Sequence, residues 1–566
     1  MADDECDYLV IGGGATGMAF SDTLLKNSPN SNTLRVVVVD KHEAPGGQWH
    51  DSYDFVQLHQ PSSGYGVESK KLENINGEGD KDSRQQHRAT RSELLQYYAD
   101  VRRELEAKHD FEFIGGSTLD LSQLYINSSM NDDGKDNSNN NINCYTITND
   151  TTALPRIIKV RKRLVDARNL TPDLPVSTPP RFAFSANTVS VVPVNDIVMR
   201  NHSNKKSNKL NSKKHFVVVG GGKTGMDAVS HLLTAKHVLP ENLLWVVPND
   251  AWITARENIG NCIDLLYTSA KLHDADIDAD IDADMDADID ATSNTDINSD
   301  EKKETDAADT TTASAASAST SKIGPDFFQR GFLEWEQQGH VYRLDPSVVP
   351  TKFKDATLSL EELTILQKAV PRMVRTGRIS EITHDGSLVF ENKIGNGNGR
   401  STMELPFPVE DTLFLHCSAG AFHCSKSHTS PPPIFQADKI IVQDVYGTPG
   451  FCFVGSMLGK LESMDNLSDD ERNAMARRPL PEASPPTTLP PLGKSGGDVL
   501  GALTNDHQFV QRAHNLRMWL DKPELRDWVF ANRLFHMAGE DPAMVSDKIE
   551  YIFEVLRKNG IVGENF

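Results

Sequence analysis

Two short runs of consecutive apolar residues along this chain are each followed at once by a turn rich in glycine. The first run, residues 8–11, leads into Gly12-Gly13-Gly14-Ala15-Thr16-Gly17, and the second, residues 215–219, leads into Gly220-Gly221-Gly222-Lys223-Thr224-Gly225. Uninterrupted apolar runs of this length, bounded by glycine, are typical of buried strands in a parallel sheet. A strand, a Gly-x-Gly-x-x-Gly turn and a helix form a unit that binds one dinucleotide, so the pattern predicts two such units.

The spacing in the first unit predicts a role for each glycine. Gly12 permits the tight turn that leaves the strand, Gly14 lets the backbone approach a pyrophosphate, and Gly17 lets the following helix pack closely on the sheet. We expect that helix over residues 15–26, with its positive end directed at the pyrophosphate. The next strand ends in Asp40, whose carboxylate is placed to accept both hydroxyls of an adenosine ribose and would repel a 2′-phosphate.

The second unit leaves the choice between NADH and NADPH open. Its second apolar run, residues 243–247, is followed by Pro248-Asn249-Asp250. Asp250 alone favours NADH, because a carboxylate near this point accepts the ribose hydroxyls. Thr254 or Arg256 could instead meet the 2′-phosphate of NADPH. The sequence therefore predicts NAD(P)H without choosing between its two forms.

The segment after Asp40 resembles a known family. It reads Pro45-Gly46-Gly47-Gln48-Trp49 and then Tyr53-Asp54-Phe55-Val56-Gln57-Leu58-His59-Gln60-Pro61. This combination is similar to the flavin-containing monooxygenases, above all to the plant auxin-forming type and to bacterial FAD/NAD(P)-binding oxidoreductases. The resemblance implies that the first glycine motif binds FAD and the second binds NADPH. It also implies that Gly46, Gly47 and Trp49 lie along the flavin and that residues 58–60 face its reactive edge.

The candidate site residues follow from the motifs and from this resemblance. His59 and Gln60 are the candidate catalytic residues, as hydrogen-bond partners of the flavin's reactive edge; the alternatives are a histidine satisfied by backbone groups and, for Trp49, an ordinary core aromatic. The residues expected to contact FAD are Gly12, Gly14, Ala15, Thr16, Gly17, Asp40, Lys41, Gly46, Gly47, Gln48, Trp49, Leu58 and His59. Those expected to contact NADP, with NAD as the alternative, are Gly220, Gly222, Lys223, Thr224, Gly225, Asp250 and Arg256.

Two later segments resemble the parts of such flavoproteins that return to the cofactors. Residues 411–420 are similar to the strand and turn that close a nucleotide domain, with Cys417-Ser418-Ala419-Gly420 in place of Ala-Thr-Gly. Residues 447–455 are similar to the returning flavin-domain strand, so Ser418 and Gly455 are also expected to contact a cofactor. Ser456 stands where disulfide reductases have an Asp.

One family fingerprint is missing. Between the two glycine motifs the family has Phe-x-Gly-x-x-x-His, and here Phe184, Ala186 and Ser190 are at best its remnant. The fingerprint helps couple NADPH to oxygen activation in the family. Its absence therefore weakens the monooxygenase prediction more than the flavoprotein prediction.

These segments predict an α/β fold with two Rossmann-like dinucleotide-binding domains, in which the NAD(P) domain is inserted into a discontinuous FAD domain. The FAD domain covers residues 1–172 and 406–470, and the NAD(P) domain covers residues 173–405. A proline-rich linker over residues 471–500 leads to a C-terminal helical segment, residues 501–566. That segment is predicted from the helical spacing of Phe509, Ala513, Leu516, Trp519, Leu520, Trp528, Val529 and Leu534.

The net charge of −22 is concentrated in one stretch. Residues 274–309 hold 13 Asp and 2 Glu against 2 Lys, mostly in a tandem tetrapeptide that begins Ile277-Asp278-Ala279-Asp280. We expect a disordered, solvated acidic insertion at about 270–322, because regularly spaced carboxylates repel one another and no core residues accompany them. A calcium-binding repeat is the alternative, but the glycines that shape such loops are absent.

Composition narrows the class of protein further. The chain of 566 residues is long enough for two or three domains. It shows neither a basic stripe for nucleic acid nor a bilayer-spanning apolar run. We expect no leader peptide before the first strand, and therefore a cytoplasmic protein. Six scattered cysteines suit reduced thiols. Zinc binding by His416, Cys417, His423, Cys424 and His428 is an alternative, but without a Cys-x-x-Cys pair we expect no metal.

Together these features predict an FAD- and NAD(P)H-dependent oxidoreductase of the flavin monooxygenase type. Hydride would pass from nicotinamide C4 to flavin N5, and oxygen would then be transferred to a small soft nucleophile or carbonyl compound. The alternatives are a nucleotide-binding flavoprotein without oxygenase activity, either redox-responsive or acting as an NAD(P)H oxidase, and a dithiol–disulfide reductase. The reductase needs two cysteines against the flavin, and the nearest pair is Cys417 and Cys424. The oligomeric state stays open.

Overall fold

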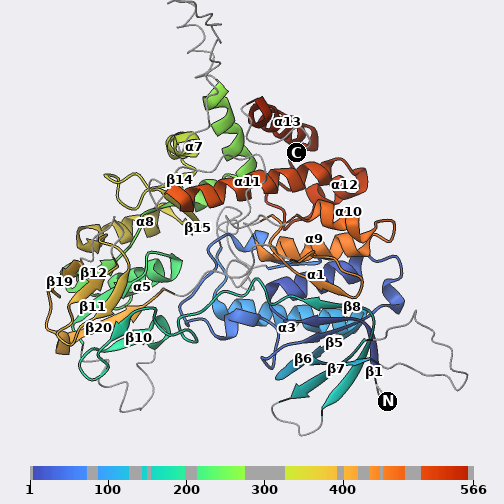
Figure 1. Ribbon diagram of the computed structural model, residues 1–566, viewed down its shortest axis with the longest axis horizontal. Helices are drawn as coiled ribbons and strands as arrows, with labels where there is room; N and C mark the ends of the chain where they lie inside the picture. Colours follow the sequence, from blue (N-terminus) through green and yellow to red (C-terminus); the bar gives the residue numbers. More distant parts are fainter. Residues whose placement is uncertain are drawn as a thin grey trace, which may run out of the picture.

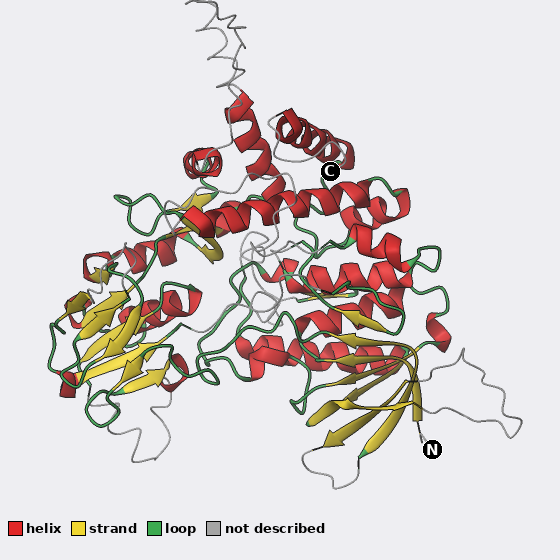
Figure 2. Cartoon of the chain, in the orientation of Figure 1, coloured by secondary structure: helices red, strands yellow, loops and turns green. Residues whose placement is uncertain are grey.

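The computed structural model of the protein describes residues 4–72, 87–126, 143–149, 155–197, 213–274, 326–391, 401–418, 432–446, 450–477 and 499–558. Two sheets with helices packed on them form two units, and C-terminal helices lie over both (Figure 1, Figure 2). The predicted α/β fold with two Rossmann-like units is confirmed. The acidic repeat, the asparagine-rich stretches and most of the proline-rich linker lie outside the described residues.

The first unit contains a seven-stranded sheet in the order β5-β2-β1-β8-β7-β6, with β21 also paired to β8. Its parallel strands are β1 (Asp4–Ile11), β2 (Arg35–Val39), β5 (Asp110–Ile114), β8 (Arg156–Asp166) and β21 (Lys439–Ile441). The antiparallel strands β6 (Ser117–Ile126) and β7 (Asn143–Asn149) extend it beyond β8. Strands β1 and β2 consist largely of buried apolar residues, as a central parallel sheet requires.

Helices α1 (Ala15–Asn27), α3 (Arg91–Lys108) and α9 (Phe451–Ser463) belong to this unit. Helices α1 and α9 pack closely through glycine (Figure 1). A Cβ atom on Gly455 would lie 2.3 Å from the carbonyl oxygen of Thr16, and one on Gly459 would lie 2.7 Å from that of Phe20. Because the contacts advance in the same direction on both helices, α1 and α9 run parallel and their amino ends lie at the same end of the sheet.

The prediction of a returning strand over residues 447–455 is wrong for its described part. Residues 447–449 lie outside the described residues, and α9 begins at Phe451. The strand that returns to the first sheet is β21, which pairs with β8 from Lys439 to Ile441. Apolar residues at consecutive positions fit a buried helix as well as a buried strand, and here every position from Cys452 to Ser463 is buried.

The second unit is built on a five-stranded sheet in the order β10-β20-β11-β12-β16, in which all neighbours are parallel. The strands are β10 (Val191–Pro193), β11 (His215–Val219), β12 (Leu243–Val246), β16 (Met373–Val374) and β20 (Thr412–His416). Since β20 lies in this sheet, the predicted domain boundary at residue 406 is too early.

Smaller elements surround the second sheet. One small sheet contains β13 (Ala251–Ala255), β14 (Val341–Tyr342) and β15 (Lys352–Leu358). Another contains β9 (Ala183–Phe184), β17 (Ile379–Ile382), β18 (Leu388–Phe390) and β19 (Ser401–Met403). The associated helices are α5 (Lys223–Thr234), α7 (Asp326–Gln337) and α8 (Leu360–Gln367). Residues 262–274 are also helical, so a helix occupies the start of the predicted acidic insertion.

The C-terminal residues form α11 (Val499–Leu520), α12 (Pro523–Ala531) and α13 (Pro542–Lys558), after α10 (Asp469–Met475). The predicted helical segment is confirmed, but it is an integral layer rather than a tail (Figure 1). Its apolar face is buried, and the Trp519 indole donates to the carbonyl of Met475 at 2.7 Å. Lys548 pairs with Asp264 of the second unit at 2.6 Å. The described residues contain no helix with the length and apolar character needed to cross a membrane.

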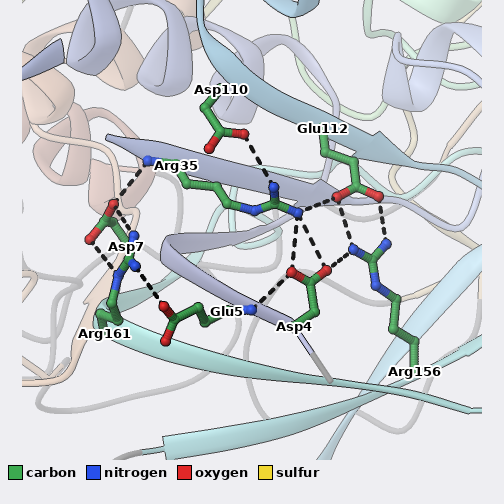
Figure 3. Close-up of polar contacts among 8 residues, drawn as sticks. All are labelled: Asp4, Glu5, Asp7, Arg35, Asp110, Glu112, Arg156 and Arg161. Atoms are coloured by element: carbon green, nitrogen blue, oxygen red, sulfur yellow. Dashed lines mark hydrogen bonds and ion pairs between the residues drawn. The ribbon is translucent and has the colours of Figure 1, made fainter. Parts of the chain in front are cut away.

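A network of charges joins the strands of the first sheet at the end away from the glycine turn (Figure 3). Arg35 donates to Asp4, Asp110 and Glu112 at 3.0–3.3 Å. Arg156 also pairs with Asp4 and Glu112. Because each guanidinium bridges carboxylates from different strands, we read this network as structural.

Candidate functional site

The first glycine turn has the geometry that a dinucleotide site requires. Gly12 has a φ angle of +103°, which favours glycine, and its N–H donates to the carbonyl of Val39 at 2.8 Å. A Cβ atom on Gly17 would lie 1.9 Å from the carbonyl oxygen of Gly12. The first and third glycines are therefore fixed by backbone geometry and helix packing, as predicted. Ala15, Thr16 and Gly17 form the first turn of α1.

Asp40 lies at the end of β2 beside this turn, with 7% of its side chain exposed. It accepts hydrogen bonds from Gly13 N at 2.6 Å, from His42 N at 2.8 Å and from His42 Nδ1 at 3.0 Å. Burial opposes ionisation of Asp40, but the hydrogen bonds from His42 and Gly13 outweigh it and hold the pKa of this carboxyl below its usual value. Asp40 is therefore a fixed negative charge next to the turn. Lys41 is exposed and pairs with Asp51 at 3.3 Å.

The predicted flavin-side segment packs directly on the turn. Gly46 N donates to the carbonyl of Gly13 at 2.9 Å, and a Cβ atom on Gly47 would lie 2.8 Å from Gly14 Cα. Gln48 Oε1 is buried and has no hydrogen-bond partner among the described residues. An orphaned acceptor in this place fits a site that a ligand with hydrogen-bond donors completes. Trp49 is buried and donates from Nε1 to the hydroxyl of Tyr65 at 2.8 Å.

The amino ends of two parallel helices point toward this turn. Gly14 caps α1 and Gly450 caps α9, and neither supplies a side-chain hydrogen bond. The first N–H groups of both helices therefore lack a side-chain cap, and both helix dipoles favour negative charge there. Gly455, which was predicted to contact a cofactor, instead lies in the contact between α9 and α1. Ser456 is buried there too, 2.7 Å from Thr23 Oγ1.

The second glycine turn repeats the first. Gly220 has a φ angle of +136°, and a Cβ atom on Gly225 would lie 2.0 Å from the carbonyl oxygen of Gly220. A Cβ atom on Gly222 would meet no described atom within 4 Å, so the backbone faces open space where a pyrophosphate would approach. Ser418 N lies 3.2 Å from the ideal Cβ position of Gly220. Ser418 therefore belongs to the second turn.

The hydrogen-bond registers show which residues of the two units correspond. Gly12 N donates to the carbonyl of Val39, and Gly220 N donates to that of Val246 at 3.0 Å. In the next position, Asp40 N donates to the carbonyl of Ile114 at 3.1 Å and Val247 N donates to that of Val374 at 2.9 Å. Val247 therefore occupies, in the second unit, the position that Asp40 occupies in the first. Asp250 lies three residues beyond it.

Asp250 and Arg256 both have partners that sequence reasoning missed. Arg375 follows β16 and donates to the two carboxylate oxygens of Asp250 at 2.8 and 3.3 Å. It also pairs with Asp345 at 2.9 Å. Arg256 is only 4% exposed and pairs with Glu362 at 2.6 Å, so its guanidinium belongs to a buried ion pair. The prediction that Arg256 meets a 2′-phosphate is not supported by this placement.

The two units meet through the segment that resembles the monooxygenases. Tyr53 of the first unit donates its hydroxyl to Asp227 Oδ2 on α5 at 2.7 Å. Lys223, in the second glycine motif, pairs with the other oxygen of Asp227. One turn further along α5, the His231 ring stacks on Phe55 with centroids 4.0 Å apart. The segment after Trp49 is thereby placed on the helix that begins at the second glycine turn.

Glu362 links the same two units. It accepts from Arg88 of the first unit at 2.8 Å and from Arg256 of the second at 2.6 Å. Arg256 in turn donates from Nε to the carbonyl of His59 at 2.8 Å. Burial raises the pKa of Glu362, but Lys223, the N–H of Ser359 and the two arginines outweigh it and lower the pKa to about 2. The carboxylate stays ionised at neutral pH and fixes the backbone of His59.

The candidate catalytic residues lie at this junction. Burial and the nearby charge of Lys223 lower the pKa of His59 to about 3, so its imidazole is neutral at physiological pH. Gln60 donates from Nε2 to the carbonyl of Gly64 at 3.4 Å, and Leu58 is buried. A neutral imidazole donates one N–H and accepts at its other nitrogen, but it cannot supply a proton as an acid.

The predicted zinc alternative and the predicted cysteine pair lie only partly within the described residues. Among the described residues, Cys6, Cys144, Cys262, Cys417 and Cys452 form no disulfide, whereas Cys424 lies outside the described residues. Burial raises the pKa of Cys417, and it raises that of Cys452 to about 11. His423 and His428 also lie outside the described residues. In the described part of the chain, no group of three or more His, Cys, Asp or Glu is arranged to hold a metal.

Known proteins resemble this chain in three ways. Residues 10–66 match the family model described as an NAD(P)-binding Rossmann-like domain. An uncharacterized protein of Mycobacterium tuberculosis strain H37Rv is 27% identical over 542 residues, which cover 95% of this chain and 79% of that protein. Among solved structures, a flavin-containing monooxygenase from Stenotrophomonas maltophilia matches with 15% identity and a TM-score of 0.27, over 43% of this chain and 58% of its own length. Cyclohexanone monooxygenase in its closed form matches with 14% identity and a TM-score of 0.41, over 99% of this chain and 98% of its own.

Proposed function

We propose that this protein is an FAD- and NADPH-dependent oxidoreductase of the flavin monooxygenase type. The observation that carries the proposal is the contact between the two nucleotide units. The segment that follows the first glycine turn donates from Tyr53 to Asp227, which also holds Lys223 of the second turn. A nucleotide on each turn would therefore extend toward the same junction, as hydride transfer between them requires.

The residues present fit both cofactors. For FAD, Asp40 would accept the ribose hydroxyls, the uncapped ends of α1 and α9 would meet the pyrophosphate and the flavin, and Gln48 Oε1 would gain a donor. For NADPH, the open space at Gly222 would admit the pyrophosphate and Lys223 would offer it a positive charge. When bound, the nicotinamide supplies a hydride and the flavin accepts it and activates oxygen.

The protein's own residues would orient and shield this exchange. Glu362 and Arg256 fix the backbone at His59, and the neutral His59 ring offers one hydrogen-bond donor without adding charge. Gln60 would be the second hydrogen-bonding group. We assign a small soft nucleophile or carbonyl compound as the oxygen acceptor. The described cysteines form no disulfide with one another, which suits a reducing compartment such as the cytosol.

We assign NADPH rather than NADH to the second site. A carboxylate at the position of Val247 would accept the ribose 2′-hydroxyl of NADH and repel a 2′-phosphate, but valine does neither. A cation, Arg375, follows the neighbouring strand β16, where Asp250 and Asp345 hold its guanidinium. Because 30% of its side chain is exposed, Arg375 can bind a phosphate in addition to these two carboxylates.

The decisive experiment is an anaerobic absorption spectrum of the purified protein, with NADPH and then NADH added, followed by air. The proposal expects a bound flavin that NADPH bleaches faster than NADH does, and whose reoxidation in air transfers oxygen to a substrate. A protein that binds no flavin would refute the assignment.

A flavoprotein without oxygenase activity is the second candidate, favoured by the missing Phe-x-Gly-x-x-x-His fingerprint. It predicts that reduced protein yields only hydrogen peroxide in air, or that NAD(P)H does not bleach the flavin at all. The third candidate, a dithiol–disulfide reductase, predicts that replacing Cys417 with Ser abolishes turnover. The raised thiol pKa of Cys417 disfavours this candidate, because the thiolate is the reactive form.

A further inference from the structure

Arg533, in the connection between α12 and α13, forms hydrogen bonds with a loop of the first unit that lies far from it in sequence. Its Nη1 donates to the carbonyl of Ser63 at 2.8 Å, and its Nη2 donates to that of Tyr65 at 3.0 Å. The carbonyls of Val67 and Lys70 also accept from Nη2. Among the described residues, Arg533 forms no ion pair within 4 Å, so its charge is met by backbone carbonyls.

The loop needs a cation at this place. Residues 63–70 lead through β3 (Gly66–Val67) into β4 (Lys70–Lys71), and four of their carbonyl oxygens point to one guanidinium. Carbonyl dipoles that converge on one point repel one another unless a donor lies between them. Loss of the guanidinium would leave these acceptors without their partner, and the loop would open to find water.

The same loop supports the predicted flavin side of the first turn. Tyr65, whose carbonyl Arg533 holds, accepts from Trp49 Nε1 at 2.8 Å through its hydroxyl. Gly66 N donates to Cys452 Sγ, in the first turn of α9, at 3.4 Å. Trp49 lies two residues after Gly47, which packs on Gly14. Tyr65 therefore connects Arg533 to the Trp49 indole, and the next residue, Gly66, connects the loop to the amino end of α9.

We infer that Arg533 is a positioning residue for the flavin, and that the C-terminal segment completes the first nucleotide site. Arg533 holds the loop of residues 63–70 in place. That loop positions Trp49 through the hydroxyl of Tyr65, and it contacts α9 through Gly66. The inference rests on the proposed function, because FAD is the molecule positioned. The ligand contacts themselves belong to Trp49 and its neighbours.

The test compares Arg533→Met with Arg526→Met in the full-length protein. Arg526 lies on α12 in the same segment, is 39% exposed and pairs only with its neighbour Asp527 among the described residues, at 3.0 Å. Stripped of flavin, each variant is titrated with FAD by fluorescence, and the visible spectrum of the bound flavin is recorded. We expect Arg533→Met to weaken FAD binding about tenfold or more and to shift the flavin spectrum, whereas Arg526→Met matches wild type.

Two further variants keep the inference testable if Arg533→Met does not fold. Arg533→Lys keeps the charge but has fewer donors. Tyr65→Phe removes the acceptor of the Trp49 indole and leaves the hydrogen bonds from Arg533 to the loop carbonyls intact. We expect both to shift the flavin spectrum in the same direction, with hydrogen exchange of residues 63–70 accelerated in Arg533→Lys alone. Wild-type FAD affinity and spectrum in both would overturn the inference and leave the proposed function standing. A wild-type protein that binds no FAD would overturn both.

Discussion

Val247 takes in the second unit the place that Asp40 takes in the first. The backbone N–H of each donates to the last carbonyl of the neighbouring strand, at 2.9 Å for Val247 and 3.1 Å for Asp40. Asp40 presents a carboxylate held by Gly13 and His42, whereas Val247 is apolar and buried. Two turns of the same backbone geometry thus differ at the position that we propose contacts the adenosine ribose.

The substitution Val247→Asp tests this difference. The new carboxylate would accept the 2′-hydroxyl of NADH and repel the 2′-phosphate of NADPH. We expect the dissociation constant of NADP+ to rise at least about tenfold relative to that of NAD+, measured by calorimetry on both nucleotides. Asn249→Asp adds the same charge two residues away and serves as the control. An equal change in both variants would contradict the assigned position.

Gly222→Ala separates nucleotide binding from folding. The ideal Cβ position of Gly222 has no described neighbour within 4 Å, whereas that of Gly225 lies 2.0 Å from the carbonyl oxygen of Gly220. We expect Gly222→Ala to unfold at the wild-type temperature yet bind NADP+ several-fold more weakly, because the methyl group occupies the pyrophosphate's approach. Gly225→Ala should instead lower stability by roughly 2 kcal/mol or more. Unchanged NADP+ binding by folded Gly222→Ala would place the nucleotide elsewhere.

Glu362→Gln tests the ion pairs that join the units, through pH. The folded-state pKa of Glu362, about 2, lies below its ordinary value of 4.5. Its contribution is therefore complete above about pH 4.5 and is lost as the pH falls toward 2. At pH 7 we expect the substitution to lower the free energy of unfolding by about 2 kcal/mol, and we expect this difference from wild type to narrow below about pH 4.5 and to vanish toward pH 2. Glu361→Gln, on the exposed neighbour, should show neither effect in the same denaturant titrations.

The pKa of His59 predicts a pH profile. Because the imidazole is protonated only near pH 3, its charge does not change across the physiological range. We expect His59→Gln to slow the reduction of bound flavin by NADPH without altering the pH dependence of that rate between about pH 5.5 and 8. Stopped-flow absorbance measures the rate at each pH. An inflection near pH 6.5 in wild type that disappears in the variant would show that His59 titrates during the reaction.

Local patterns predicted most of the nucleotide turns. The glycines of both motifs, the strands before them and Asp40 lie within short stretches whose geometry depends on neighbours in sequence, so spacing alone identifies them. The apolar run at residues 243–247 is one residue longer than β12, which ends at Val246. Because Val247 belongs to that run, its correspondence with Asp40 was not apparent from the sequence. Aligning the end of this strand with the end of β2 in the first unit would have identified Val247 as the counterpart of Asp40.

Long-range partners could not be predicted from the sequence. Glu362, Arg375 and Arg533 act on residues distant in sequence, and nothing near them in the chain signals those contacts. The segment that begins at Phe451, for which a strand is predicted, does carry a sequence signal for a helix. Gly455 and Gly459 are four residues apart, a spacing that brings small residues onto one face of a helix and permits close packing. That spacing favours a helix, whereas the family resemblance had suggested a strand.

The pairing of β21 with β8 and of α9 with α1 has a consequence for how the protein is made. A ribosome synthesises α1 long before α9, which packs on α1 and begins only at Phe451. Until then the face of α1 that packs on α9 stays exposed, and the nascent chain carries an unfinished domain through the synthesis of the whole second unit. Chaperones that shield exposed apolar surface during translation should therefore bind its early portion and leave only after α9 has emerged.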